Sequence, residues 1–221
     1  MTRLLPPGAW QTLFPRALML LGEVRTHGGI KEPFWTLGGG TVLMFRYRHR
    51  LSKDIDIFVP DPQYLGYVSP RLSDVAADLT SDYIEQPGAF IKLQFEEGEV
   101  DFVASPNLLD EAWETWDILG HAVKVETASE IIAKKMHYRG DRATARDLFD
   151  LSLVIEREPE ALRQAAPFLV RHRQAFLKQV RQPHPTLKAA FDAIATLDYT
   201  PNFDHCVSVT NAFLTGLEEN E

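Results

Sequence analysis

Two aspartates separated by one isoleucine, Asp54 and Asp56, lie in the segment DIDIFVP, which otherwise has the composition of a buried strand. Alternate side chains of a strand share a face, so both carboxylates point to one side while Ile55, Ile57 and Val59 point into the core. Neighbouring carboxylates repel each other unless a cation lies between them, and hard divalent ions prefer oxygen ligands of this kind. The pair therefore predicts a Mg²⁺ or Mn²⁺ site, with a solvent-facing strand edge as the alternative.

A glycine-rich turn precedes the acid pair. The segment FWTLGGG reads as a short strand that runs into this turn, and a helix is expected over about residues 41–48. A glycine turn at a helix N-terminus lets backbone N–H groups approach a phosphate, and the helix dipole favours the negative charge. An ordinary tight turn is the alternative. Together with the acids, the turn indicates a phosphate group that shares the bound metal ion.

The neighbouring segments define the elements that must hold these groups. Helices are expected over residues 10–28 and 70–85, and FIKLQF and EVDFVA predict a β-hairpin that turns at Gly98. Strand signals stop after about residue 126, where Thr127 and Glu130 match a capping box that opens a helix ending near Gly140. A second helix is expected from about Asp141, followed by further helical segments. The sequence thus predicts an α+β protein, with a core over residues 1–125 and a helical domain over residues 126–221.

A third carboxylate is available on the second strand of the hairpin. Val100 and Phe102 would face the core, which leaves Asp101 on the other side. If its strand is adjacent, Asp101 can meet Asp54 and Asp56 and complete a set of metal ligands. An ordinary hairpin acid is the alternative.

The helix that follows Thr127 places cations on its apolar stripe. At about 100° per residue, Lys135 and Arg139 fall within the stripe, while Lys134 lies at its flank and is interpreted as a solvated charge. Lys135 and Arg139 would either reach phosphates in a cleft or snorkel outward to solvent. His49, His121 and His137 lack a metal-binding spacing and are interpreted as surface or supporting residues.

Residues Gly39, Gly40 and Thr41, followed by RLSKDID, resemble the first motif of the DNA polymerase β-type nucleotidyltransferases. The closer resemblance is to the AbiEii/AbiGii toxin family, also called MenT-type toxins, and it covers roughly residues 35–155. It implies a mixed sheet flanked by helices, followed by a helical bundle that contributes to the active-site cleft. It also implies an enzyme that transfers a nucleoside monophosphate from an NTP, with Mg²⁺ or Mn²⁺ as cofactor.

The resemblance also implies roles for individual residues, and its last motif, a helix lysine followed by Arg-Asp-x-x-Asp-Leu, falls on Lys135 and on Arg146, Asp147 and Asp150. For Asp147, a helix N-terminal charge paired with Arg139 or Arg142 is the alternative. The implied metal ligands are Asp54, Asp56 and Asp101. The implied catalytic residues are Asp54, Asp56, Lys135 and Asp147. The implied nucleotide-binding residues are Gly39, Gly40, Thr41, Ser52, Lys135 and Arg139.

The implied partners are an RNA acceptor, with the tRNA 3′ end favoured, and a cognate antitoxin protein. Nucleotidyl transfer to a small molecule such as an antibiotic is an alternative, as is a silent RNA- or protein-binding module, although the intact acids argue against the latter. The net charge of −8 over 221 residues requires any RNA site to be local. Two basic clusters are candidates and are expected to border one cleft: Arg46, Arg48, Arg50 and Lys53, and Lys135, Arg139, Arg142 and Arg146.

The composition also bears on location. The single cysteine, Cys206, cannot form an internal disulfide, and the N-terminal segment MTRLLPPGAW lacks the apolar stretch of a signal peptide. No segment approaches the roughly 20 apolar residues of a membrane span. A cytoplasmic protein without a membrane partner is expected.

Overall fold

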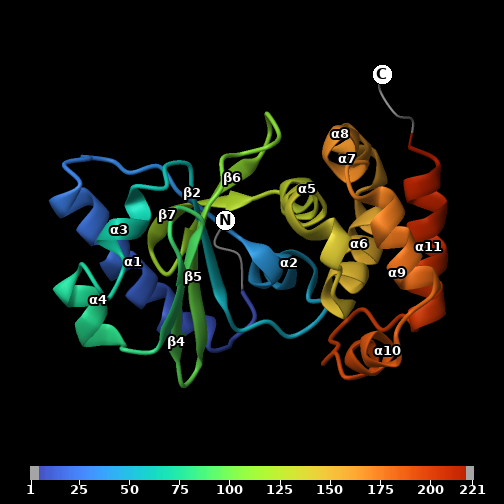
Figure 1. Cartoon of the computed structure of the whole chain (residues 1–221), viewed down its shortest axis with the longest axis horizontal. Coiled ribbons are helices and arrows are strands. Elements are labelled where there is room, and N and C mark those ends of the chain that lie inside the picture. The colour runs from blue at the N-terminus through green and yellow to red at the C-terminus, as the bar shows by residue number, and fades with distance from the viewer. Residues whose placement is uncertain (1–4, 218–221) are drawn as a thin grey trace. The chain divides into compact units, whose positions relative to one another are not determined.

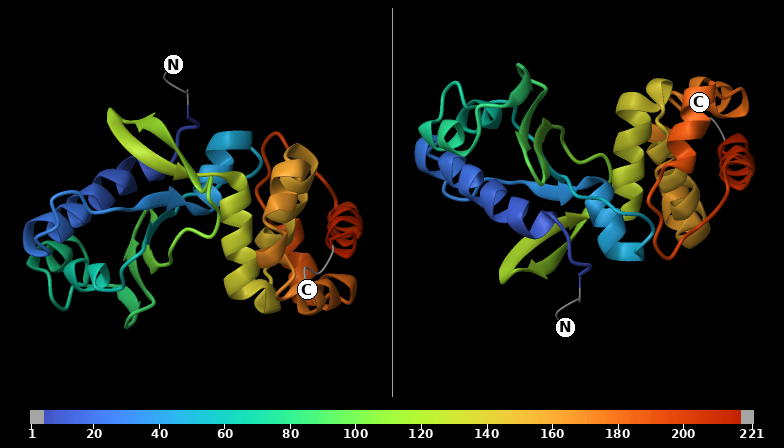
Figure 2. Two further views of the ribbon diagram at one scale, coloured as in Figure 1. Left: turned by 90° about the horizontal axis from the view of Figure 1, so that it is seen from above. Right: turned by 90° about the horizontal axis from the view of Figure 1, so that it is seen from below.

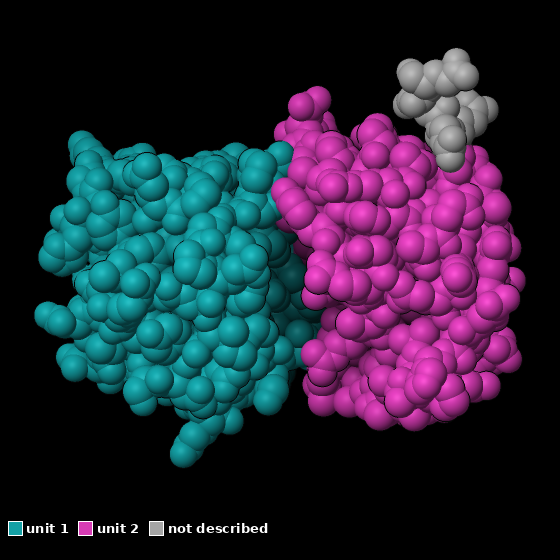
Figure 3. Space-filling model, viewed as in Figure 1, with its two compact units in different colours: residues 1–45, 52–107, 113–126 teal, residues 46–51, 108–112, 127–221 magenta. Residues whose placement is uncertain are grey.

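The structure, a computed structural model, describes residues 5–217. The chain divides into two compact units, which Figure 3 colours separately. Unit 1 comprises the residues up to Phe45, Ser52–Asn107 and Trp113–Glu126. Unit 2 comprises Arg46–Leu51, Leu108–Ala112 and the residues from Thr127 onward. Unit 1 contains all the strands of the described chain and unit 2 is helical, which confirms the predicted α+β class.

Unit 1 is built on a seven-stranded mixed sheet of order β3-β4-β5-β2-β1-β7-β6. Strands β2 and β5 pair in parallel, as do β1 and β7, and the other neighbouring pairs are antiparallel. The strands are β1 Thr36–Gly38, β2 Ile55–Val59, β3 Tyr83–Gln86, β4 Phe90–Phe95, β5 Gly98–Ala104, β6 Trp113–Ile118 and β7 His121–Glu126.

Helices cover one face of this sheet. Helix α1 (Trp10–His27) contacts β2 and β5, and α3 (Tyr64–Tyr67) contacts β5. Helix α4 (Asp74–Leu79) packs on α1, and Figure 1 shows the three helices together on one side of the sheet. The strand residues facing them, such as Ile57 and Phe102, are buried. Asp56 and Asp101 alternate with these residues and therefore lie on the opposite face.

Unit 2 is a bundle centred on α6 (Ala145–Arg157), against which several other helices pack. Helix α11 (Phe203–Thr215) packs on α6 and α9 (Arg173–Arg181), and its red ribbon lies beside the orange helices in both views of Figure 2. The remaining helices are α5 Ala128–Arg139, the 3₁₀ turn η1 Gly140–Arg142, α7 Pro159–Gln164, α8 Ala166–Leu169 and α10 Pro185–Asp192. Within residues 5–217, no helix combines the length and apolar character needed to cross a membrane.

Several sequence predictions of elements are confirmed, including α1, β1, β2 and the hairpin of β4 and β5. The helix expected over residues 70–85 is wrong in extent, because α4 has six residues and the chain then becomes extended at Thr80 and enters β3. The second C-terminal helix begins at Ala145, since the reciprocal hydrogen bonds of Thr144 and Asp147 form a capping box there. Thr127 caps α5 as predicted, but the Glu130 carboxylate instead accepts hydrogen bonds from Leu108 and Leu109.

Candidate active site

The glycine turn brings the backbone into contact with one of the paired acids. Gly39, the first residue of α2 (Gly39–Tyr47), has a φ of +71°, and a Cβ at this position would lie 1.8 Å from Oδ2 of Asp56. Both the backbone conformation and the close approach therefore require glycine. Gly40 follows in the first turn of α2, where backbone N–H groups have no partner within the helix. The turn thus places an anion-binding backbone beside the Asp56 carboxylate.

Thr41 and Ser52 join the start of α2 to the segment before β2. The Thr41 hydroxyl donates to the carbonyl oxygen of Asp54 at 2.5 Å and lies 3.0 Å from the Ser52 hydroxyl. The Thr41 side chain is fully buried. Its hydroxyl therefore holds the loop at Asp54. The Asp54 carboxylate accepts a hydrogen bond from the backbone N–H of Glu99 at 3.1 Å.

The third acid lies beside the pair. Because β2 and β5 are parallel neighbours, Asp56 and Asp101 are register partners on the same face of the sheet. The sequence predicted that Asp101 would meet the pair only if its strand were adjacent, and β5 is indeed adjacent to β2. Burial, reinforced by the charge of Asp56, raises the pKa of Asp101 to about 7. One carboxylate oxygen of Asp101, Oδ1, is buried without a hydrogen-bond partner.

Lys92 is a member of this site that the sequence reasoning missed. Its ammonium lies 2.6 Å from Oε2 of Glu99 and 3.0 Å from Oδ2 of Asp101. Burial disfavours the ammonium, but the hydrogen bond to Glu99 and the charge of Asp101 outweigh it and raise the pKa of Lys92. The predicted hairpin could have identified Lys92, because a register that pairs Phe95 with Gly98 also pairs Lys92 with Asp101.

The three predicted metal ligands have the right chemistry for Mg²⁺, but within residues 5–217 their side chains are not arranged as a ready-made metal site. Asp54, Asp56 and Asp101 offer the hard carboxylate oxygens that Mg²⁺ prefers, and the buried Oδ1 of Asp101 still lacks a partner. In the part of the chain that the structure describes, no three His, Cys, Asp or Glu side chains are close enough to hold a metal ion between them. The carboxylates instead use protein donors, because Asp54 accepts from Glu99 and Asp101 from Lys92.

Unit 2 contains the predicted cation Lys135. Its ammonium lies 2.9 Å from Oδ1 of Asp147 and 2.8 Å from Oδ2 of Asp150, and its side chain is 11% exposed. Arg139 also pairs with Asp147, at 2.7 Å, although its side chain is 48% exposed. Despite burial, the charges of Lys135 and Arg139 lower the pKa of Asp147 to about 2. Two acids of the last motif therefore hold the lysine ammonium in place.

Asp150 organises a buried network around the segment before Ser52. Its fully buried carboxylate accepts two hydrogen bonds from Arg50, at 2.7 and 2.8 Å, in addition to that from Lys135. It also lies 2.9 Å from Nε2 of His49. Although burial opposes ionisation, Arg50 and Lys135 hold the pKa of Asp150 well below its ordinary value. Burial lowers the pKa of His49.

Two predicted surface cations are buried instead. Lys134 is 4% exposed and lies 3.4 Å from Glu130, so its interpretation as a solvated charge is wrong. Arg50 is buried on Asp150 and cannot present its guanidinium to an RNA backbone. Glu130 lies one helical turn before Lys134, an i, i+4 spacing that is visible in the sequence, whereas Asp150 lies 100 residues from Arg50 and no local pattern reveals it.

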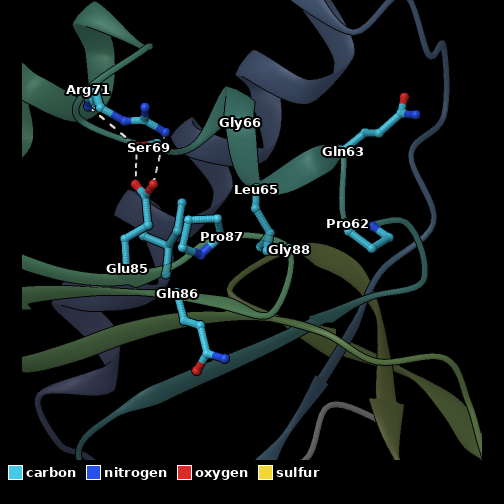
Figure 4. A pocket seen from close by; sticks show the side chains of 11 residues that line it. Pro62, Gln63, Leu65, Gly66, Ser69, Arg71, Glu85, Gln86, Pro87 and Gly88 are labelled. Carbon is cyan, nitrogen blue, oxygen red and sulfur yellow. Dashed lines mark hydrogen bonds and ion pairs between the residues drawn. The ribbon is translucent and has the colours of Figure 1, made fainter.

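A separate pocket of about 220 Å³ lies on unit 1 between α3 and the turn from β3 to β4. Figure 4 shows Glu85 in its wall, held by the Ser69 hydroxyl and by Arg71. The pocket also includes Ile91, which faces the opposite side of β4 from Lys92. It contains none of the predicted site residues and is not the candidate active site.

Comparison with solved structures identifies the class of fold. The crystal structure of a "putative nucleotidyltransferase" from H. pylori matches with a TM-score of 0.54 at 15% identity, covering 97% of this chain and 100% of that chain. MenT4, a nucleotidyltransferase toxin from Mycobacterium tuberculosis H37Rv, matches with a TM-score of 0.50 at 18% identity, covering 92% of this chain and 85% of that chain. At these identities the likeness shows a nucleotidyltransferase fold.

The family of the chain follows from a match between its sequence and a family profile. The profile of the family described as "Nucleotidyl transferase AbiEii toxin, Type IV TA system" matches residues 28–219, and the chain belongs to this family. It is therefore a nucleotidyltransferase of a toxin–antitoxin family, as the resemblance implied. A search of curated proteins found no match.

Proposed function

We propose that this enzyme transfers a nucleoside monophosphate from an NTP to a hydroxyl at an RNA end, with the tRNA 3′ end as the favoured acceptor. The observation that carries the proposal is the register of Asp56 and Asp101 on one sheet face, beside the backbone of Gly39 at the start of a helix. This arrangement combines hard oxygen donors with an anion-binding turn. A bound NTP requires both, because its phosphates need neutralisation as well as orientation.

Asp54, Asp56 and Asp101 would hold Mg²⁺ or Mn²⁺ in this proposal. When bound, the ion supplies Lewis-acid stabilisation of the charge that builds on the departing pyrophosphate. Contacts within the protein hold the backbone that carries two of these acids. Thr41 holds the Asp54 backbone, and the buried neighbours Ile55 and Ile57 anchor the strand that carries Asp56.

The backbone N–H groups of Gly39 and Gly40 would bind phosphate oxygens of the NTP, and the dipole of α2 would favour the negative charge. The Ser52 hydroxyl, which lies on the Thr41 hydroxyl, is the side-chain donor proposed to join them. An alanine at position 39 would fill the space that Asp56 uses. The turn thus binds phosphate without a side chain that would compete with the acid.

Lys135 and Arg139 are the proposed phosphate-neutralising cations. Asp147 and Asp150 hold the Lys135 ammonium by two ion pairs. These restrict its position and partly neutralise its charge. Arg139 shares Asp147, and about half of its side chain is exposed. In this account Asp147 is a positioning residue that acts through Lys135.

The RNA acceptor is proposed from the exposed cations and from the family. Arg48, Arg139 and Arg142 have side chains that are 55%, 48% and 75% exposed, and Lys53 is also exposed. Local cations can bind a phosphate backbone although the chain carries a net charge of −8, which disfavours non-specific binding elsewhere. Because the family is a toxin–antitoxin family, we also propose a cognate antitoxin as protein partner and tRNA in the cytoplasm as the target.

The proposal is tested by incubating the protein with each α-labelled NTP, Mg²⁺ and total tRNA. We expect label on tRNA with at least one NTP, and none on tRNA whose terminal diol has been oxidised with periodate. Label on oxidised tRNA would place the acceptor elsewhere on the RNA. If no NTP labels RNA while a small hydroxylated or aminated compound is labelled, the small-molecule alternative replaces the RNA proposal.

A further inference from the structure

Residues 161–191 of unit 2 contain six arginines and lysines and no aspartate or glutamate. The whole chain, by contrast, has 31 acidic and 23 basic residues and a net charge of −8. The segment runs from within α7 to within α10 and includes all of α8 and α9. Positive charge is therefore concentrated in one part of an acidic protein, and the contacts of the six cations decide whether it is structural.

Two of the six cations have structural partners. Arg173 is buried and donates to the carbonyl oxygens of Leu214 and Leu217, at 3.4 and 2.9 Å, at the end of α11. Arg163 pairs with Glu160. The other four are exposed, and no carboxylate of residues 5–217 forms an ion pair with them: Arg171, Lys178, Arg181 and Lys188.

Helix α9 presents two of these cations on one outward face. Gln174, Lys178 and Arg181 are exposed and recur at spacings of four and three residues, which places them on one side of the helix. Buried residues such as Phe176 face the bundle. At 1.5 Å per residue, the exposed row spans about 10 Å. The Nε of Arg181 lies 2.8 Å from Oδ1 of Asn211, a neutral partner that leaves the guanidinium charge uncompensated.

An aromatic side chain lies next to Arg171, which precedes α9. The rings of His137 and Tyr138 pack edge to face, with centroids 4.8 Å apart, and Nη1 of Arg171 lies 2.9 Å from Nε2 of His137. Tyr138 is 46% exposed. Burial, reinforced by the charges of Arg171 and His172, lowers the pKa of His137, so the positive charge acts on this aromatic pair.

We propose that Tyr138, Arg171, Lys178 and Arg181 form an RNA-docking surface of unit 2, which binds the phosphate backbone of the acceptor and stacks an unpaired base on the tyrosine ring. The inference rests on the proposed function, because it takes the acceptor to be RNA. Exposed cations without carboxylate partners are available to phosphates, and an aromatic ring stacks on any unpaired base. The surface therefore favours a single strand over a duplex and acts on RNA affinity rather than on NTP affinity.

A solvated basic face is the competing explanation, and an acidic protein is the alternative partner. One acid lies beside the row, because Gln179 donates to the backbone carbonyl of Asp141. The carboxylate of Asp141 lies 3.6 Å from Nε of Arg142 and so does not neutralise α9. A solvated face predicts that RNA affinity follows net charge alone, whereas a docking surface predicts that it depends on these positions.

The test measures binding of end-labelled tRNA to the full chain by fluorescence anisotropy over a range of salt concentrations. The main variant combines Arg171→Gln, Lys178→Gln and Arg181→Gln. Near 0.1 M salt we expect its dissociation constant to rise by about tenfold or more. The slope of log affinity against log salt should fall by about 2, because each single-strand phosphate contact contributes about 0.7. NTP affinity should stay at the wild-type value.

A matched control removes the same charge from three exposed positions elsewhere, by Arg25→Gln, Lys31→Gln and Arg157→Gln. It should change the dissociation constant for tRNA by less than about threefold. For the ring, Tyr138→Leu should weaken binding by about fivefold or more without changing the salt slope, while Tyr138→Phe should bind like wild type because it keeps the aromatic face. Wild-type affinity in Tyr138→Leu would overturn the assignment of the ring.

Equal affinity and slope in wild type and the main variant would overturn the surface, while labelling of tRNA by wild type would still support the proposed acceptor. An equal loss in the control variant would overturn it in favour of net charge. Binding of polyglutamate but not RNA through these residues would overturn it in favour of an acidic protein. Wild type that neither binds nor labels RNA would refute the proposed acceptor itself. If circular dichroism shows the main variant unfolded, Lys178→Glu alone decides, because Lys178 forms no side-chain hydrogen bond or ion pair with the residues that the structure describes, and it should weaken tRNA binding by about threefold or more.

Discussion

Replacing Gly39 by alanine tests whether the glycine turn and the acid pair form one site. Two penalties apply at this position. The φ of +71° is disfavoured for any residue with a Cβ, which costs about 1–2 kcal/mol. The added Cβ would also lie 1.8 Å from Oδ2 of Asp56. The strand cannot yield easily, because Ile55 and Ile57 on either side of Asp56 are fully buried.

The second penalty should therefore displace the carboxylate. Overpacking of this kind costs about 1–3 kcal/mol, so with the backbone penalty the total loss of unfolding free energy is expected to be about 2–5 kcal/mol. Gly29 offers a matched control, since its φ is +67° and no atom lies within 4 Å of an added Cβ. Gly29→Ala should lose only about 1–2 kcal/mol through backbone strain.

Urea unfolding and Mn²⁺ binding measure the two effects. We expect Gly39→Ala to weaken Mn²⁺ binding by about tenfold or more, which corresponds to at least about 1.4 kcal/mol, while Gly29→Ala binds like wild type. If the two variants lose the same stability and both retain Mn²⁺ affinity, Asp56 does not depend on the bare Gly39 backbone. The reasoning that joins the turn to the acid would then be refuted.

Three further predictions concern unit 2. Asp150→Asn should lower the unfolding free energy by about 3–5 kcal/mol, because it leaves Arg50 buried without a full counter-charge. Urea unfolding measures this loss, and a loss below about 1 kcal/mol would contradict the network. Because the pKa of Asp147 is lowered to about 2, its ionisation contributes about 2 kcal/mol that is present at neutral pH and lost as the pH falls from about 5 to 1. Asp147→Asn should flatten this acid dependence, and an unchanged slope would show that other groups cause it. Lys134→Ala should destabilise by about 3 kcal/mol, since the buried Glu130 would lose its counter-charge and keep only the backbone donors of Leu108 and Leu109, and it should leave NTP affinity unchanged.

Local patterns were sufficient to predict much of the sheet that carries the acids. The alternation of Ile55, Asp56 and Ile57 assigned each side chain to a face, and the hairpin turn at Gly98 set the strand of Asp101. These features depend on residues close in sequence. The parallel pairing of β2 with β5 does not, so the meeting of Asp56 and Asp101 could only be stated as conditional.

Charge partners distant in sequence were the main omission. Lys135 pairs with Asp147 and Asp150 of α6, whereas the partner of Lys134, Glu130, lies four residues away on α5, at a spacing that the sequence shows. A helical periodicity describes which side of α5 each lysine occupies, but it does not report which carboxylate arrives there from α6. Asp150 meets Arg50 across 100 residues of sequence, and no local signal predicts such a pair.

Transfer of labelled nucleotide to tRNA by acid variants tests the central claim most directly. Wild type, Asp54→Asn, Asp56→Asn and the matched control Asp61→Asn, an acid beyond the end of β2, would be compared with the best NTP and Mg²⁺. The account predicts that wild type and Asp61→Asn label the tRNA 3′ end, and that Asp54→Asn and Asp56→Asn, while folded, lose at least about a hundredfold in rate. Labelling by the folded Asp54 and Asp56 variants at the wild-type rate would contradict it.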